Sequence, residues 1–180
     1  MFYRAVVTNN QDPDKAGRCL LKIIGIHDGD AGGNAWAERM GGTDFGLNNG
    51  VGISSTFQVG TWVWCFLDHD NPNKPVIFGT CIDKGDFHSS AAGQYGNMQT
   101  IHTASGHLIE LGDAGGDSRI QITHSAGTKV TIDNAGKITI ECVSDVTHNI
   151  SGKLDVTTGG ATTFTSGGAF TVSAPAINLN

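Results

Sequence analysis

The sequence predicts an all-β protein in two parts, a small closed barrel followed by an intertwined β-helix that several copies of the chain build together. Glycine is abundant and proline scarce, with 26 and 4 residues among 180, which indicates strands joined by many turns. The first half carries short apolar segments separated by turn residues. The second half repeats every eight residues. These three observations justify the two parts in turn.

The first part, residues 1–95, contains five candidate strands. Each is short, rich in β-branched or aromatic residues, and bounded by Gly, Asn, Asp or Pro. No segment in this part shows a helical period. Five short strands suit a small closed barrel of the OB-fold kind. The candidate strands are residues 3–8, 19–26, 35–39, 62–67 and 75–80.

The second part, residues 106–180, follows a short linker at 96–105. Aromatic residues become rare, and residues 106–133 alternate apolar and polar side chains, which predicts wide strands at the entry to the β-helix. Beyond them a small residue returns at every eighth position, where glycine tolerates the backbone angles of a corner. The corner positions are Gly136, Ser144, Gly152, Gly160, Gly168 and Ala176.

Each eight-residue unit, called an octad below, has an inside and an outside. Residues two, four and six places after the corner are mainly apolar, and the residues between them are polar. Thr158, Thr162 and Ser166 place hydroxyl groups on the inside. The predicted apolar core consists of Ile138, Ile140, Val146, Ile150, Leu154, Val156, Phe164, Phe170 and Val172.

One chain of octads cannot bury its own apolar side. Three chains wound around a common axis would close each other's sheets into a triangular prism with a dry core and no long free edge. The repeat therefore predicts a homotrimer. A flexible Gly/Ser/Thr linker is the alternative interpretation, but a linker does not require both the eight-residue period and the alternation.

Charge and composition bear on the partners. The net charge of −6 and the absence of a basic patch argue against nucleic acid and against an anionic membrane surface. No apolar run approaches the ~20 residues that span a bilayer, and no signal peptide is expected. The cysteines have no metal-type spacing and are expected to be buried free thiols, in a protein made in a reducing cytoplasm. They are Cys19, Cys65, Cys81 and Cys142.

Three stretches together resemble the central baseplate spike of contractile-tailed bacteriophages, a family related to the VgrG spike of type VI secretion. The first resembles the opening of that family's OB-fold, the second its closing hairpin, and the third the start of its triple-stranded β-helix. In order they are residues 5–18 (AVVTNNQDPDKAGR) with 23–27 (IIGIH), residues 59–68 (VGTWVWCFLD) with 75–80 (PVIFGT), and residues 105–111 (SGHLIEL) with 119–124 (RIQITH) and the octads.

The resemblance implies a structural, non-enzymatic cell-puncturing device of the virion, at the tip of the tail baseplate, made in the cytoplasm of the host bacterium. Sheath contraction would drive it into the target cell's outer membrane. Some relatives insert a lysozyme domain between barrel and β-helix, and the short join here leaves no room for one. The chain also begins at the barrel, so the resemblance implies a separate hub protein bound through the barrel.

The C-terminal end departs from short spikes that bind iron through a His-x-His motif at the apex. No histidine follows His148 in this sequence. The resemblance therefore implies that a PAAR-type tip protein caps the prism. Its docking residues would be Ile177, Leu179 and Asn180.

His148 is the candidate metal ligand, because it lies on the inside of its octad between Val146 and Ile150. Threefold symmetry would bring three imidazoles around the axis. They would either form a hydrogen-bonded core with water or an anion, or bind a metal ion at ~2.0–2.1 Å. No other cofactor is predicted.

The remaining polar and aromatic residues predict no catalytic site. His27, His69 and His88 lie in turn-like segments and are expected to be solvated. A second group near the start of the prism includes acid–base candidates, but no nucleophile pattern or phosphate loop accompanies it: His102, His107, His124, Glu110, Asp113 and Asp117. The tryptophans are expected in the barrel core or at contacts with other chains or the hub, rather than stacked on bases: Trp36, Trp62 and Trp64.

Other functions fit parts of the sequence. The shaft of a trimeric receptor-binding tail fibre would share the β-helix but predicts a C-terminal globular head, which the sequence does not show. A pyocin or type VI-like particle would use the same spike. An envelope-degrading enzyme would turn over peptidoglycan, and a free nucleic-acid-binding OB-fold would bind oligonucleotides in a salt-sensitive manner.

Overall fold

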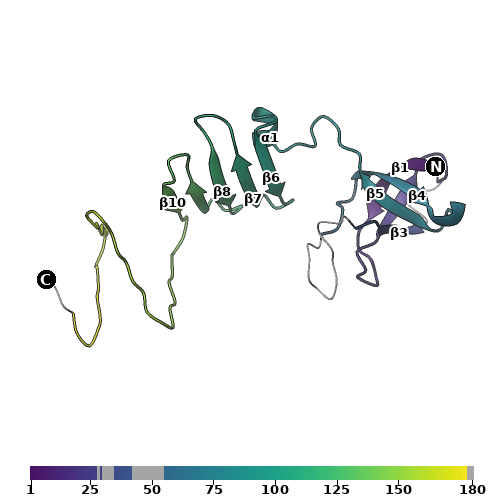
Figure 1. Ribbon diagram of the computed structural model, residues 1–180. Coiled ribbons are helices and arrows are strands. Elements are labelled where there is room, and N and C mark those ends of the chain that lie inside the picture. Colours follow the sequence, from purple (N-terminus) through teal and green to yellow (C-terminus); the bar gives the residue numbers. More distant parts are fainter. Residues whose placement is uncertain (28, 30–34, 42–54, 178–180) are drawn as a thin grey trace.

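The computed structural model describes residues 1–27, 29, 35–41 and 55–177. Five strands of the N-terminal half form a closed barrel in the order β1-β2-β3-β5-β4, with β4 pairing back to β1. The β3–β5 pair is parallel, and the other pairs are antiparallel. The strands are β1 (Phe2–Asn9), β2 (Cys19–Ile23), β3 (Ala35–Arg39), β4 (Trp62–Leu67) and β5 (Pro75–Thr80). The predicted closed barrel in an all-β chain is thereby confirmed (Figure 1).

The barrel is closed around its own core. Alternate residues of each strand point inward, so that β2 buries Leu21 and Ile23 completely. The second strand ends at Ile23 instead of continuing to residue 26, because Gly25 adopts a φ of 81° and starts a turn. The core also contains Ala5, Val7, Cys19, Ala37, Val63, Cys65 and Ile77.

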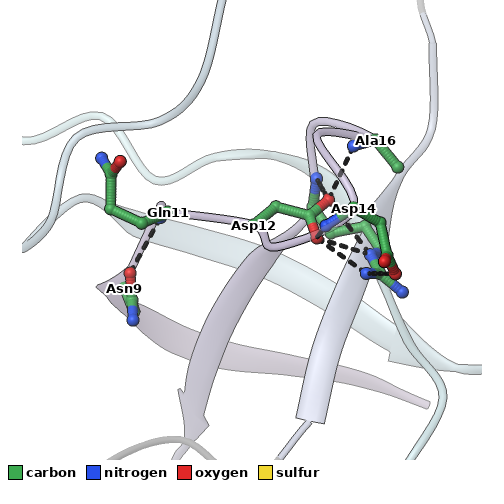
Figure 2. A network of polar contacts seen from close by, with 6 residues as sticks. Asn9, Gln11, Asp12, Asp14 and Ala16 are labelled. Carbon is green, nitrogen blue, oxygen red and sulfur yellow. Dashed lines mark hydrogen bonds and ion pairs between the residues drawn. The ribbon is translucent and has the colours of Figure 1, made fainter.

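A polar clasp shapes the loop between β1 and β2 (Figure 2). The carboxylate of Asp12, whose side chain is only 3% exposed, pairs with Arg18 at 2.7 Å. The same carboxylate accepts hydrogen bonds from the backbone N–H groups of Asp14, Ala16 and Arg18. Hydrogen bonds from the Arg18 side chain hold the pKa of Asp12 well below its usual range. The clasp fixes the turn that the sequence placed at this loop.

The connections between the strands hold more structure than the sequence predicted. A short 3-10 turn, η1 (Asp68–Asp70), joins β4 to β5, and a helix, α1 (Ser89–Gly93), begins after its N-cap His88. The strand β6 (Met98–His102) lies within residues 96–105, which the sequence assigned to a linker, and occupies half of them. The reason is pairing: β6 is aligned along its whole length with β7, and Met98 and Ala91 of α1 are buried.

The C-terminal half begins with an open antiparallel sheet of five consecutive strands, in the order β10-β9-β8-β7-β6 (Figure 1). Tight turns join the strands, and each turn contains a glycine with positive φ: Gly106, Gly116, Gly127 and Gly136. Four further strands follow β6: three lie within the alternating residues 106–133, as predicted, and β10 lies in the first octad. They are β7 (Leu108–Gly112), β8 (Arg119–Thr123), β9 (Lys129–Ile132) and β10 (Ile138–Glu141).

Residues 142–177 follow β10 and contain neither helix nor strand in the single chain. They run as an extended trace that leaves the sheet and changes direction several times (Figure 1). Among the described residues, no helix is long and apolar enough to cross a membrane.

Candidate functional site

The sheet β6–β10 carries apolar side chains in two rows on one face, called the apolar sheet face below. Strand register aligns them, because directly opposite residues of paired strands share a face. Each of the nine apolar side chains is at least 36% exposed, and Ile101 reaches 69%. One row is Ile101, Ile109, Ile122, Val130 and Ile140. The other is Leu111, Ile120, Ile132 and Ile138, extended by Gln99 at its edge.

The opposite face of the sheet is polar and internally bonded. Gln121 donates a hydrogen bond to the Glu110 carboxylate at 2.9 Å, and Arg119 approaches the same carboxylate at 3.7 Å. Long neighbouring side chains leave Glu110 only 3% exposed. At the far edge Lys129 pairs with Glu141 at 2.7 Å. Within one chain the usual arrangement is inverted at this sheet, since the Glu110 carboxylate is covered and the isoleucines of the opposite face are exposed.

The exposed apolar side of the sheet continues into the apolar side of the octads. All nine predicted core residues are exposed in the single chain, from 46% at Ile150 to 75% at Phe164. The first two, Ile138 and Ile140, belong to both the octad series and the apolar sheet face. An exposed apolar stripe of this length marks an interaction surface. Burial of these residues in a core shared by three chains stays a prediction.

The chain bends at the spacing of the predicted corners. Bends lie at residues 143–144, 151–152, 159–160 and 167–168, positions that include the corner residues Ser144, Gly152, Gly160 and Gly168. Gly136 sits in the β9–β10 turn with a φ of 78°, and Ala176 follows a bend at residue 175. An eight-residue period is thus present in the backbone as well as in the sequence.

Two contacts already connect neighbouring octads within one chain. Thr158 Oγ1 donates a hydrogen bond to the carbonyl of Gly160 at 2.9 Å and lies 2.9 Å from Thr162 Oγ1, across the corner. The rings of Phe164 and Phe170 stack with centroids 5.8 Å apart. The hydroxyl pair and the aromatic pair therefore form successive layers toward the C-terminus.

The predicted metal and cap residues lie on this exposed stripe or beyond the described chain. His148 is exposed, and the described residues contain no group of three or more His, Cys, Asp or Glu that could hold a metal ion. One chain supplies a single imidazole to a threefold axis, so the His148 site stays a prediction. Ile177 is 53% exposed, whereas Leu179 and Asn180 lie outside the described residues.

The other histidines differ from expectation in one case. His27 is buried, not solvated, and its Nδ1 accepts a hydrogen bond from the Ile23 backbone. His69 is exposed, and His88 caps α1.

At one end of the sheet the rings of His107 and His124 approach to 4.5 Å between centroids. Each of these two Nδ1 atoms accepts a backbone N–H, which favours the Nε2–H tautomer.

The acidic side chains near these histidines are engaged in pairing within the sheet. Glu110 and Asp117 both contact Arg119. A hydrogen bond from Gln94, followed by that from Arg119, lowers the pKa of Asp117. Asp113 donates its backbone N–H to the Asn97 carbonyl. These contacts explain the carboxylates of Glu110 and Asp117 as structural partners of the sheet, which Asp113 joins through its backbone.

The barrel has an exposed aromatic surface formed in part by the tryptophans of β4. Trp62 and Trp64 are each 41% exposed, whereas Val63 and Cys65, the alternate residues of β4, are completely buried. Of the two predicted positions for the tryptophans, the barrel core is thereby excluded for Trp62 and Trp64, and contacts with other chains or the hub stay a prediction. Trp36 is half-buried beside Arg18. The aromatic face of the barrel is defined as Phe2, Trp62, Trp64, Phe66 and Phe78.

The sequence named Trp62 and Trp64 as possible contacts but not the continuous aromatic face, although β4 carried the signal for it. A strand buried on one side alternates apolar and polar residues, whereas β4 reads WVWCFL without a polar residue. Such a strand is apolar on both sides. Its outer side is exposed in the single chain, which makes it a second candidate interaction surface.

The comparisons with known proteins assign no family. No protein-family model matches the sequence, and no curated protein matches it significantly.

Proposed function

We propose that this chain is the homotrimeric central spike of a contractile injection machine, a phage tail or a related pyocin or type VI-like particle. In this proposal the N-terminal half is an OB-fold and the C-terminal half is one strand of a triple-stranded β-helix. The barrel's strand order, with its single parallel pair β3–β5, supports the OB-fold assignment.

The observation that carries the proposal is the uncovered apolar side of the C-terminal half. It starts on the apolar sheet face and continues through Ile138 and Ile140 into octads that bend every eight residues. A single layer of strands has nothing to pack against. Three copies would each contribute one five-stranded sheet to a face of the prism, with the apolar sides turned to a common axis.

The mechanical role follows from that architecture. Beyond β10 each chain would cross from one face of the prism to the next at the octad corners, so that every strand pairs with another chain. Unfolding would then require many interchain strands to separate together, which gives high kinetic stability. The outer surface would be polar, with Lys129, Glu141 and the octad threonines facing water.

The partners in this proposal lie at opposite ends of the spike. A baseplate hub protein would hold the barrels, and a PAAR-type tip protein would cover the apolar end at Ile177. Contraction of the sheath would push the spike through the outer membrane of the target cell. The protein would be located in the virion and would act without enzymatic turnover, metal or nucleic acid, apart from an ion at the His148 layer.

The first test is the solution mass of the full chain. Light scattering should give three times the chain mass, and the trimer should survive SDS without heating. A monomer would overturn the proposal, because the octads would then share no core.

A second test separates a piercing spike from a fibre shaft. Deleting residues 152–180 should leave a trimer that assembles into particles through its sheets. Such particles should still adsorb to cells but should not penetrate them. Loss of adsorption would indicate a receptor-binding fibre, and unchanged infectivity would count against piercing.

A further inference from the structure

The aromatic face runs along the whole of β4, from Trp62 to Phe66. Phe2 is paired opposite Phe66 with their rings 6.3 Å apart, and Phe78 contacts Phe2 at 5.7 Å. Phe2 and Phe78 are 61% and 58% exposed. Aromatic residues, methionine and arginine are the side chains enriched in protein interfaces. The barrel core is complete without this face, so stability of one barrel does not explain it.

A cleft of about 1080 Å³ between barrel and sheet joins this face to the C-terminal half. Trp62 and Arg4 line the barrel side of the cleft, and Gln99 of β6 lines the sheet side. Gln99 stands beside Leu111 in the second row of the apolar sheet face. The cleft is therefore bordered by the aromatic face at Trp62 and by the edge of the second row of the sheet face at Gln99. A neighbouring chain that covers one of them is brought next to the other.

The cleft also contains complementary charges. Arg4 lies over the Trp62 ring at 5.0 Å and forms no ion pair among the described residues. The carboxylates of Asp83 and Asp86 line the same cleft and bond only to backbone N–H groups in the described chain. In a ring of identical subunits, one surface meets a different surface of the next copy. Arg4 of one copy can thus form ion pairs with Asp83 and Asp86 of the next copy.

We propose that the aromatic face is an interface between barrels: it packs against the 81–88 segment and the barrel of the neighbouring copy, with Arg4 facing that copy's Asp83 and Asp86. This inference rests on the proposed trimer. The partner that covers the aromatic face is a second copy of this chain. The face extends along β4 toward the sheet and is not confined to one end of the barrel, so a neighbouring barrel can cover it. The prism would hold the barrels at high effective concentration, so a modest contact suffices to keep them together.

The test uses the full chain carrying Trp36→Phe, in which Trp62 and Trp64 are the only tryptophans. Light scattering gives the oligomeric state, and acrylamide quenching of tryptophan fluorescence gives the exposure of the aromatic face. We expect a trimer whose quenching constant is several-fold below that of the same chain unfolded in guanidinium. The wild-type chain, measured in parallel, checks that the substitution leaves the mass unchanged.

Each other outcome is informative. A trimer quenched as freely as the unfolded chain would overturn the inference and assign the aromatic face to another partner such as a hub, while the trimer itself stands. A monomer would overturn both the inference and the proposed function.

Arg4→Glu should expose the tryptophans, and adding Asp83→Lys with Asp86→Lys should protect them again. Unchanged quenching in Arg4→Glu would overturn the charge pairing.

Discussion

The barrel and the C-terminal sheet have the same number of strands, yet they treat apolar side chains in opposite ways. In the barrel, Val63 and Cys65 point inward and are completely buried. In the sheet, Ile120 and Ile122 point out of the layer and are 48% and 53% exposed. The difference is closure, since a barrel wraps its inner face around itself, whereas an open single layer has an uncovered side.

The two halves differ in how much of their strand pairing and core a single chain provides. Strand β4 pairs on both sides within the barrel, so the barrel's hydrogen bonds and core come from one chain. The sheet keeps free edges at β6 and β10, and free edges together with an apolar face favour pairing with other chains. We therefore expect local substitutions to act on one half without disturbing the other.

The largest effect is expected from a charge on the inside of the octads. Val156→Asp would place three carboxylates close together near the proposed axis, and each buried unpaired charge costs several kcal/mol. The variant should lose its resistance to SDS, because the octads around residue 156 come apart, while its barrel still folds and the sheets keep the chains associated. Light scattering and unheated SDS electrophoresis measure the change.

Thr157→Asp is the matched control, because it introduces the same charge one residue away on the polar side. It should keep the mass and SDS resistance of the wild type. Equal behaviour of the two variants would show that the octads have no inside, and the prism proposal would fail.

A truncation in the barrel core should instead destabilise the barrel and leave the trimer intact. Leu21→Ala removes a completely buried side chain of the barrel, and such truncations cost about 2–5 kcal/mol. The thermal unfolding of the barrel should shift to a lower temperature, while the chain remains a trimer. Leu20→Ala, on the outer side of β2, should shift it much less. If Leu21→Ala dissociates the trimer, the two halves are not independent.

The elements that could be predicted from sequence are those whose boundaries are set by local chemistry. β3, β4 and β5 begin and end where predicted, because turn residues flank each of them. β2 ends earlier than its apolar run, since Gly25 turns the chain before Ile26. β6 was missed because a strand at the edge of a sheet is defined by its partner β7, which a local pattern does not reveal.

The candidate surfaces show the same limit. The alternation of the octads predicted an inside, and the backbone bends at the predicted spacing. The sequence left the tryptophans of β4 either in the barrel core or at contacts with other chains or the hub. Which side of a strand the core occupies depends on closure of the barrel, so only the fold shows that Trp62 and Trp64 face outward. An apolar strand with no alternation was the available signal.

The smallest effect, a difference in thiol reactivity, separates the two halves directly. Burial raises the pKa of the Cys65 thiol to about 11, so roughly one thiol in a thousand is ionised at pH 8. Cys65 should resist iodoacetamide both in the wild type and in Val156→Asp. Cys142 is exposed in the single chain and lies on the inside of the first octad. It should therefore react slowly in the wild-type trimer and quickly in Val156→Asp, as peptide mass spectrometry would show. Equal rates for Cys142 in both proteins would mean that no neighbouring chain covers the inside at this octad, and the shared core would have to begin nearer the C-terminus.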